Sequence, residues 1–211
     1  MSATDRERWD ARHAAAGPPT PAPPRALRDA PDLLEAFPVR GRALDVACGR
    51  GAVAVWLARR GLTVDAVDVS PAGLAAGARL AAASGLAGRI RFVAHDLDAG
   101  LPPDCAGPYD VVVCQLFRDP ARYRDLAAAL APGGLLAVTV LSRSGLSPSG
   151  PGPGPFRAAP GELRAAFRDL DVLLHREGDG EATLLARAPQ RPTAGPPTAP
   201  PGSRPAPRPP S

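Results

Sequence analysis

The spacing of apolar residues along the chain alternates between the period of a strand and that of a helix. Strand-like apolar runs lie at 42–47, 63–67, 90–94, 109–114 and 135–141. Segments with helical spacing lie between several of them, at 53–60, 72–84 and 121–130. The inner strands are continuous apolar runs such as "DVVVC", as expected where helices cover both faces of a parallel sheet. This alternation predicts an α/β fold with a doubly wound, mostly parallel sheet.

The two ends of the chain add elements to this sheet. The runs 171–176 and 182–187 flank the turn "EGDGE" and predict a C-terminal antiparallel hairpin, which completes a seven-stranded, Rossmann-like sheet. One more helix is expected at 160–168, before the hairpin. Near the N-terminus, Thr4 as N-cap and Glu7 three residues later predict a short helix, and 27–37 a second one. The Pro/Ala/Arg-rich stretch 189–211 is expected to be a disordered tail.

Composition and charge narrow the class of protein. With 211 residues, 45% of them hydrophobic, the chain is large enough for one domain with its own core. The net charge of +4 comes from arginines that are scattered along the chain, which disfavours a nucleic-acid partner. Cys48, Cys105 and Cys114 lack the spacing of a metal site or disulfide framework, so we expect reduced thiols and no metal. In the absence of an apolar leader or a run of ~20 apolar residues, we expect a soluble, cytoplasmic protein without a membrane partner.

The candidate chemistry begins where the first predicted strand ends. Gly49 and Gly51 form a turn in which a ligand can approach the backbone, because glycine has no Cβ. The run "GRGAVA" from Gly49 to Ala54 matches the G-x-G-x-x-G/A pattern of dinucleotide sites, although such a match is weak evidence in a chain rich in both residues. Asp45, inside the strand, argues against a dinucleotide, because a pyrophosphate site gains nothing from a nearby anion. It favours a cationic ligand such as S-adenosylmethionine, which carries a sulfonium and an α-ammonium group but no phosphate.

Two further acids follow the next two strands. Asp68 is placed to accept hydrogen bonds from ribose hydroxyls, a position that NAD sites also use. Asp96 follows the third strand and can accept from an adenine amino group. Acids at three successive strand ends predict S-adenosyl-L-methionine as the cofactor. An NAD-dependent oxidoreductase, whose NADH binding would survive the loss of Asp45, stays open as an alternative.

Five motifs carry a resemblance to a known family. In order, "ALDVACGRG", "VDAVDVSPAGL", "HDLD", "YDVVVCQLF" and "LAPGGLLAVTVL" resemble the motifs of class I S-adenosylmethionine-dependent methyltransferases, over about 42–141. More narrowly, "ERWDARHA" and "GELRAAF…LLARAP" are similar to small bacterial methyltransferases of the tellurite-resistance and thiopurine-methyltransferase-like group. The resemblance implies a methyltransferase domain over 41–188, N-terminal helices over 1–40 that cap its site, and a small-molecule acceptor: a thiol, chalcogen oxyanion, amine or hydroxyl.

The resemblance also implies which residues bind the cofactor. The methionine part would be surrounded by Asp45, Ala47, Gly49 and Gly51, the ribose bound by Asp68, the adenine edge by Val69 and Ser70, and the adenine by Asp96 and Leu97. Gln115 would face both the cofactor and the acceptor. Ala47 departs from the pattern, because many members of the family have glycine there.

Candidates for the acceptor side lie partly outside these motifs. Trp9 and Arg12 share a helical face with His13 and would contact the acceptor if their helix caps the site, as in similar enzymes; alternatively, Trp9 only anchors the helix. By resemblance Arg118 points to the same side, although an exposed surface arginine is an equal alternative. His95 is either a base beside the cofactor or, more commonly for a lone histidine, a packed or solvated side chain.

No dedicated catalytic residue is assigned from the sequence. Methyl transfer from an activated sulfonium mainly requires orientation and the exclusion of water. Enzymes that methylate amino groups of nucleic acids resemble one another in an Asn/Asp-Pro-Pro-aromatic run after the fourth strand. This chain has "CQLF" at that position, which disfavours a nucleic-acid substrate. Cys114 is interpreted as a structural thiol. A noncatalytic, cofactor-binding regulatory module stays open as a further alternative.

Overall fold

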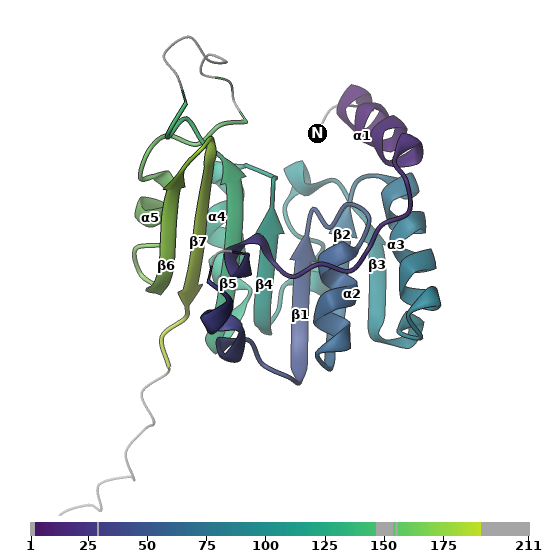
Figure 1. Ribbon diagram of the computed structural model, residues 1–211, viewed down its shortest axis with the longest axis horizontal. Coiled ribbons are helices and arrows are strands. Elements are labelled where there is room, and N and C mark those ends of the chain that lie inside the picture. The colour runs from purple at the N-terminus through teal and green to yellow at the C-terminus, as the bar shows by residue number, and fades with distance from the viewer. Residues whose placement is uncertain (1–2, 29, 147–153, 155, 191–211) are drawn as a thin grey trace, which may run out of the picture.

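The protein is a seven-stranded sheet with helices on both faces (Figure 1). The computed structural model describes residues 3–28, 30–146, 154 and 156–190. The strand order is β3-β2-β1-β4-β5-β7-β6. The parallel strands are β1 (Gly41–Val46), β2 (Leu62–Asp68), β3 (Ile90–Ala94), β4 (Tyr109–Gln115) and β5 (Leu130–Leu141), and the antiparallel hairpin is β6 (Asp171–Gly178) and β7 (Glu181–Arg187). The predicted doubly wound α/β sheet with a C-terminal hairpin is therefore confirmed.

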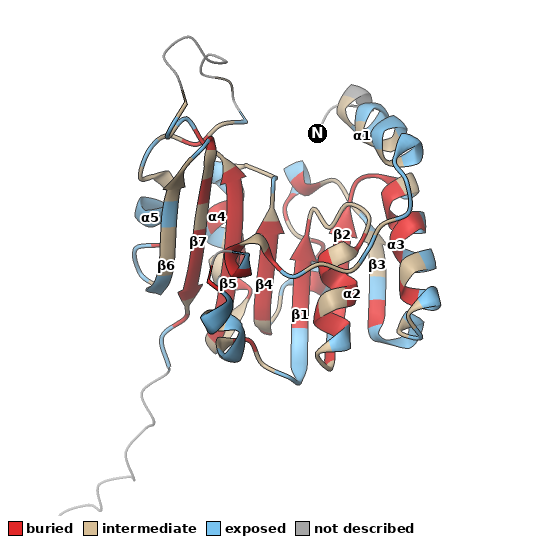
Figure 2. Cartoon of the chain, viewed as in Figure 1, coloured by how far each residue is buried: buried red, intermediate tan, exposed pale blue. Residues whose placement is uncertain are grey.

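The helices are exposed on their outer faces and buried where they face the sheet (Figure 2). They are α1 (Ala3–Ala15), α2 (Ala52–Arg59), α3 (Pro71–Ala83), α4 (Tyr123–Ala128) and α5 (Glu162–Ala166), with 3₁₀ turns that include η1 (Arg25–Leu27) and η2 (Pro31–Ala36). One face of the sheet packs against α2, α3, η1 and η2, and the other against α4 and α5. Within the described residues, no helix is long and apolar enough to cross a membrane.

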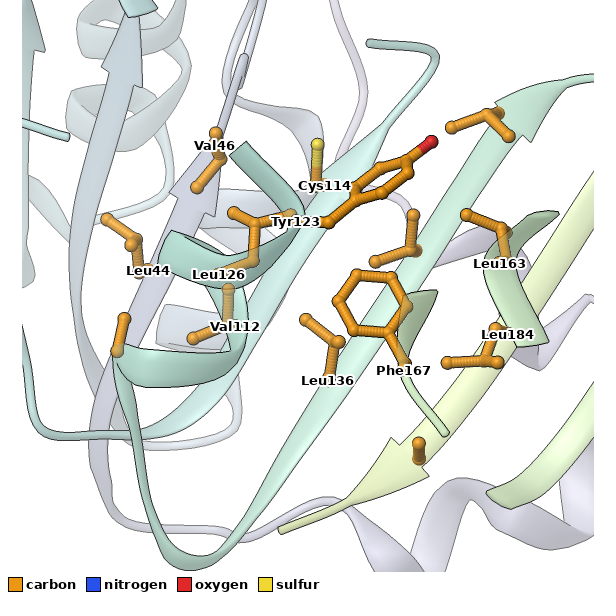
Figure 3. Close-up of a cluster of buried hydrophobic side chains, with 14 of the residues drawn as sticks. Leu44, Val46, Val112, Cys114, Tyr123, Leu126, Leu136, Leu163, Phe167 and Leu184 are labelled. Atoms are coloured by element: carbon orange, nitrogen blue, oxygen red, sulfur yellow. The ribbon is translucent and has the colours of Figure 1, made fainter. Parts of the chain in front are cut away.

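Two apolar clusters separate the sheet from these helices. In β4, Val111 and Val113 face the α2 side, whereas Val112 and Cys114 face the α4 side, because successive side chains of a strand point to opposite faces. Figure 3 shows the α4 side, where Tyr123 and the aromatic ring of Phe167 cover the strands. Burial on both faces explains why these strands read as continuous apolar runs.

Three local predictions differ from the structure. The helix expected at 27–37 is wrong: the segment forms the two 3₁₀ turns η1 and η2, because the residue before a proline is pushed out of the helical region, and Ala30 has φ −142°. Thr4 is not an N-cap, since α1 already begins at Ala3. The helix expected at 160–168 is limited to α5, which begins after the left-handed Gly161. The predicted tail falls almost entirely on 191–211, outside the described residues.

The topology places a site at the carboxyl ends of the parallel strands. Successive strands run outwards from β1 to β3, and the chain then returns to β4 on the other side of β1. This reversal of strand order is where open α/β sheets bind ligands. The helix α1 lies at the same edge, beside α3 (Figure 1).

Candidate active site

A cavity of about 950 Å³ lies at this edge of the sheet. It is lined by Asp5, Arg8, Trp9, Arg12 and His13 of α1, by Ala47, Gly49, Asp68, Val69 and Asp98 at or after strand ends, by Gln115, Leu116, Phe117, Arg118 and Asp119 from β4 onwards, and by Leu141 and Phe156. The cavity therefore brings together eight of the residues predicted for cofactor or acceptor: Trp9, Arg12, Ala47, Gly49, Asp68, Val69, Gln115 and Arg118.

The two glycines of the turn after β1, Gly49 and Gly51, have different surroundings. Ala47 and Gly49 both have φ +54° and line the cavity. Gly51, at φ +70°, does not line it; it precedes α2, and a Cβ there would lie 3.0 Å from both the Gly77 Cα and the Phe92 ring. Gly49 thus offers its backbone to a ligand, and Gly51 allows close packing between the turn and α3.

Asp68 fixes the geometry of the turn. Its Oδ2 accepts the Gly49 N–H at 2.8 Å, and its Oδ1 accepts the Ser70 N–H at 2.9 Å. The residue is buried but still lines the cavity. A carboxylate has about four lone-pair sites, so Asp68 keeps acceptor capacity towards a ligand.

Asp45 lies behind the turn and not on the cavity lining. Only 3% of the residue is exposed, and its Oδ2 has no hydrogen-bond partner. Burial first, and then the charge of Asp68, raise the pKa of Asp45 to about 8, despite a backbone hydrogen bond from Ala54. The side chain is therefore mostly protonated at neutral pH, and its assignment to the cofactor remains a prediction.

The raised pKa of Asp45 makes stability depend on pH. Between pH 4 and pH 8 the folded state holds a proton that the unfolded state releases, so this contribution to stability is full at low pH and lost as pH rises through about 8. In the wild type, the free energy of unfolding should fall by up to about 1.4 kcal/mol per pH unit in this range. Asp45→Asn should remove that slope. Urea unfolding of both proteins from pH 5 to pH 8 measures it; parallel curves would contradict the burial argument.

Three predicted cofactor residues have other partners in the structure. The Ser70 side chain is fully buried, donates to Asp10 Oδ1 at 2.6 Å and accepts the Gly73 N–H at 3.0 Å, as the N-cap of α3. Asp96 accepts the Asp98 N–H at 3.0 Å. Leu97 is buried in the apolar cluster on the α4 side. None of Ser70, Asp96 and Leu97 lines the cavity, and Asp98, two residues after Asp96 in "HDLD", does.

Gln115 and Arg118 are held in place from outside the cavity. The Gln115 Oε1 accepts the Arg25 N–H of η1 at 2.6 Å, which leaves its NH₂ group as the donor side. Arg118 forms a bidentate ion pair with Glu162, with both donor–acceptor distances 2.7 Å. Glu162 also accepts hydrogen bonds from the Tyr123 hydroxyl and the Ala159 N–H. Arg118 is therefore an oriented cavity residue and not an exposed surface arginine.

The helix α1 supplies one wall of the cavity. Trp9 and His13 stack with ring centroids 5.8 Å apart, and the Arg12 guanidinium lies 5.1 Å from the Trp9 ring centroid. Burial lowers the pKa of His13, so its ring is neutral at pH 7. The shared face of Trp9, Arg12 and His13 that their spacing predicts is thus turned into the cavity.

Other candidate groups lie apart from this cavity. The His95 ring contacts the Gly100 carbonyl at 3.1 Å. Burial, and then Asp45, raise the pKa of Cys114 to about 12, which supports a structural thiol. A second hollow of about 440 Å³ at the opposite strand ends contains Asp65 and Arg91, already joined in an ion pair of 2.7 Å. Among the described residues, no group of His, Cys, Asp and Glu could hold a metal ion.

Sequence reasoning missed several cavity residues. Phe117 and Asp119 lie next to predicted residues, so the strand end at Gln115 was a usable signal. Leu141 and Phe156 border the Gly/Pro-rich stretch, part of which lies outside the described residues, and no local pattern marks them. Asp10 and Glu162, which hold α1 and Arg118, also carry no local signal.

The central part of the chain is similar to known proteins. Residues 43–134 match the family model of a methyltransferase domain. A ubiquinone biosynthesis O-methyltransferase of Caulobacter sp. (strain K31) is 40% identical over 109 residues, which is 49% of this chain and 42% of the relative. The chain thus spans less than half the length of that relative.

Solved structures share the fold at lower identity. TehB from Haemophilus influenzae has a TM-score of 0.62 and is 22% identical, covering 75% of this chain and 62% of its own. An S-adenosylmethionine-dependent methyltransferase from Geobacter sulfurreducens, in complex with S-adenosyl-L-homocysteine, has a TM-score of 0.60 and is 21% identical, covering 79% and 72%.

Proposed function

We propose that this chain, whose residues 43–134 match a methyltransferase domain, transfers a methyl group from S-adenosyl-L-methionine to a small-molecule acceptor. One observation carries the proposal. A single cavity is bordered by the strand-end residues Gly49 and Asp68 and by a separate wall that contains Trp9, Arg12 and Arg118. Its volume of about 950 Å³ is in the range of small-molecule sites.

The residues at the strand ends fit the cofactor. Gly49 presents backbone without a Cβ, and Asp68 retains lone pairs for the two ribose hydroxyls. Val69 offers an apolar surface beside Asp68. We assign these residues to the cofactor, with Asp98 in the place expected for Asp96. Ala47 also lines the cavity, so the small side chain in place of glycine leaves room there.

The cofactor supplies an activated methyl group, and the residues of this chain orient the acceptor. Trp9, Phe117 and Phe156 provide an apolar surface against which an acceptor can be oriented, and α1 forms one wall of the cavity. Arg12 favours acceptors that react as anions, because a nearby positive charge lowers the pKa of a thiol or hydroxyl, whereas the charge of Arg118 is already balanced by Glu162. This favours thiolates and chalcogen oxyanions among the possible acceptors, and it needs no dedicated base.

Calorimetric titration tests the cofactor directly. We expect the purified protein to bind S-adenosyl-L-homocysteine with a micromolar dissociation constant and to show no heat with NADH. An acceptor screen with S-adenosyl-L-methionine would then begin with thiols and chalcogen oxyanions. Binding of NADH alone would overturn the proposal in favour of an oxidoreductase. Tight cofactor binding without turnover of any acceptor would favour a noncatalytic module.

A further inference from the structure

Asp10 connects α1 to the segment that follows β2. Its Oδ1 accepts hydrogen bonds from the Ser70 hydroxyl at 2.6 Å and from the Ala72 N–H at 2.8 Å. Both donors stand at the N-terminus of α3, where a negative charge is favoured by the exposed N–H groups. The hydrogen bond from Ser70, followed by that from Ala72, lowers the pKa of Asp10. Asp10 is therefore a charged group that docks α1 on α3.

An unbroken run of hydrogen bonds continues from Asp10 to the glycine turn. The Ser70 N–H donates to Asp68 Oδ1 at 2.9 Å, and Asp68 Oδ2 accepts the Gly49 N–H at 2.8 Å. Asp68 and Gly49 line the cavity, whereas Asp10 and Ser70 do not. Asp10 thus contacts, through Ser70, the carboxylate that we assign to the cofactor ribose.

Two further contacts hold α1 against the same segment. The His13 ring lies so close to α3 that a Cβ on Gly73 would be 3.1 Å from its Cδ2. At the end of α1, the Arg50 guanidinium donates to the carbonyls of Ala16, at 3.3 Å, and Gly17. All of these contacts are made to the glycine turn or to the start of α3, the side of the cavity assigned to the cofactor.

We propose that Asp10 is a positioning residue that couples cofactor binding to the docking of α1. By holding Ser70, and through it Asp68, the carboxylate supports the cofactor site from behind. In return, a bound cofactor that fixes Asp68 and Gly49 holds α1 in place over the acceptor wall, because coupling between two sites is reciprocal. The acceptor wall is then held most firmly when the cofactor is bound, which predicts that the cofactor binds first. This inference rests on the proposed function.

The test combines ligand affinity with hydrogen exchange in the full chain. Asp10→Ala should weaken S-adenosyl-L-homocysteine binding about tenfold, the size expected for losing a charge-assisted hydrogen bond, although Asp10 does not line the cavity. Asp10→Asn retains an acceptor oxygen and should lose less. Glu7→Gln is the matched control, because Glu7 is an exposed acid of the same helix, and it should bind as the wild type. In the wild type, the ligand should slow exchange of the α1 amides, and in Asp10→Ala this slowing should be lost.

The outcomes separate this inference from the proposed function. If Asp10→Ala binds the ligand as tightly as Glu7→Gln, or if the ligand still protects α1 in Asp10→Ala, the coupling is overturned and the proposed function is not. If the wild type does not bind S-adenosyl-L-homocysteine, the proposed function falls, and the coupling with it. A purely structural role would lower the melting temperature of Asp10→Ala and leave ligand-induced protection of α1 unchanged.

Discussion

Asp68→Ala should weaken S-adenosyl-L-homocysteine binding at least about 100-fold while the chain remains folded. The substitution removes the acceptor for the N–H groups of Gly49 and Ser70, so the turn loses its anchor at the cavity. It also removes the carboxylate that we assign to the ribose hydroxyls. The loss of two or three charge-assisted hydrogen bonds, each worth about 1.5–3 kcal/mol, exceeds the ~2.8 kcal/mol that corresponds to 100-fold. Calorimetric titration gives the affinity, and circular dichroism verifies the fold.

Two variants control this experiment. Asp68→Asn retains the shape but turns a donor NH₂ towards one of the two backbone N–H groups, so it should also bind poorly. Asp65→Asn changes an acid in the middle of the same strand, where the carboxylate pairs with Arg91. It should lower stability without changing the affinity. Wild-type affinity in a folded Asp68→Ala protein would remove Asp68 from the cofactor site.

Gly51→Ala should be the most destabilising of the single substitutions considered, by about 2–5 kcal/mol. At φ +70° a residue with a Cβ costs roughly 1–2 kcal/mol. The Cβ would also lie 3.0 Å from the Gly77 Cα, a backbone atom that cannot rotate away, which adds an overpacking cost of about 1–3 kcal/mol. Single domains are stable by only about 5–15 kcal/mol, so this is a large loss. Urea unfolding measures it.

Gly85 separates the two parts of that cost. It has the same φ of +70°, but a Cβ there would meet nothing within 4 Å. Gly85→Ala should therefore lower the free energy of unfolding only by the backbone cost of about 1–2 kcal/mol. The difference between the two variants isolates the contact between the turn and α3. Equal free energies of unfolding would mean that the helix shifts at no cost and that the close approach is unimportant.

The part of the cavity that we assign to the cofactor was predictable because its residues follow strands. The period of the strands can be read locally, and parallel strands end at one edge of a sheet, which places Gly49, Asp68 and Gln115 together in space. Two of the predicted acids, Asp45 and Asp96, do not line the cavity. Asp45 lies behind the turn, and Asp98 lines the cavity where Asp96 was expected.

The contacts that hold the acceptor wall were not predictable, since they join residues far apart in the chain. Asp10 meets Ser70 60 positions away, and Arg118 meets Glu162 44 positions away. Neither pair has a local spacing, because such pairs form only once the sheet has brought their helices together. The cofactor role predicted for Ser70 also takes no account of Asp10 and the start of α3, to which its hydroxyl donates and from which it accepts a hydrogen bond.

Part of the cavity wall lies outside the stretch of chain that matches the methyltransferase family. The matched methyltransferase domain runs from 43 to 134, and α1, Leu141 and Phe156 lie outside it. Since α1 pairs with no strand, substitutions of Trp9 or Arg12 on its cavity face leave the sheet intact. On the proposed function, a lineage can therefore exchange its acceptor by remodelling this 13-residue helix, and two chains with the same ancestral sheet can come to act on different molecules.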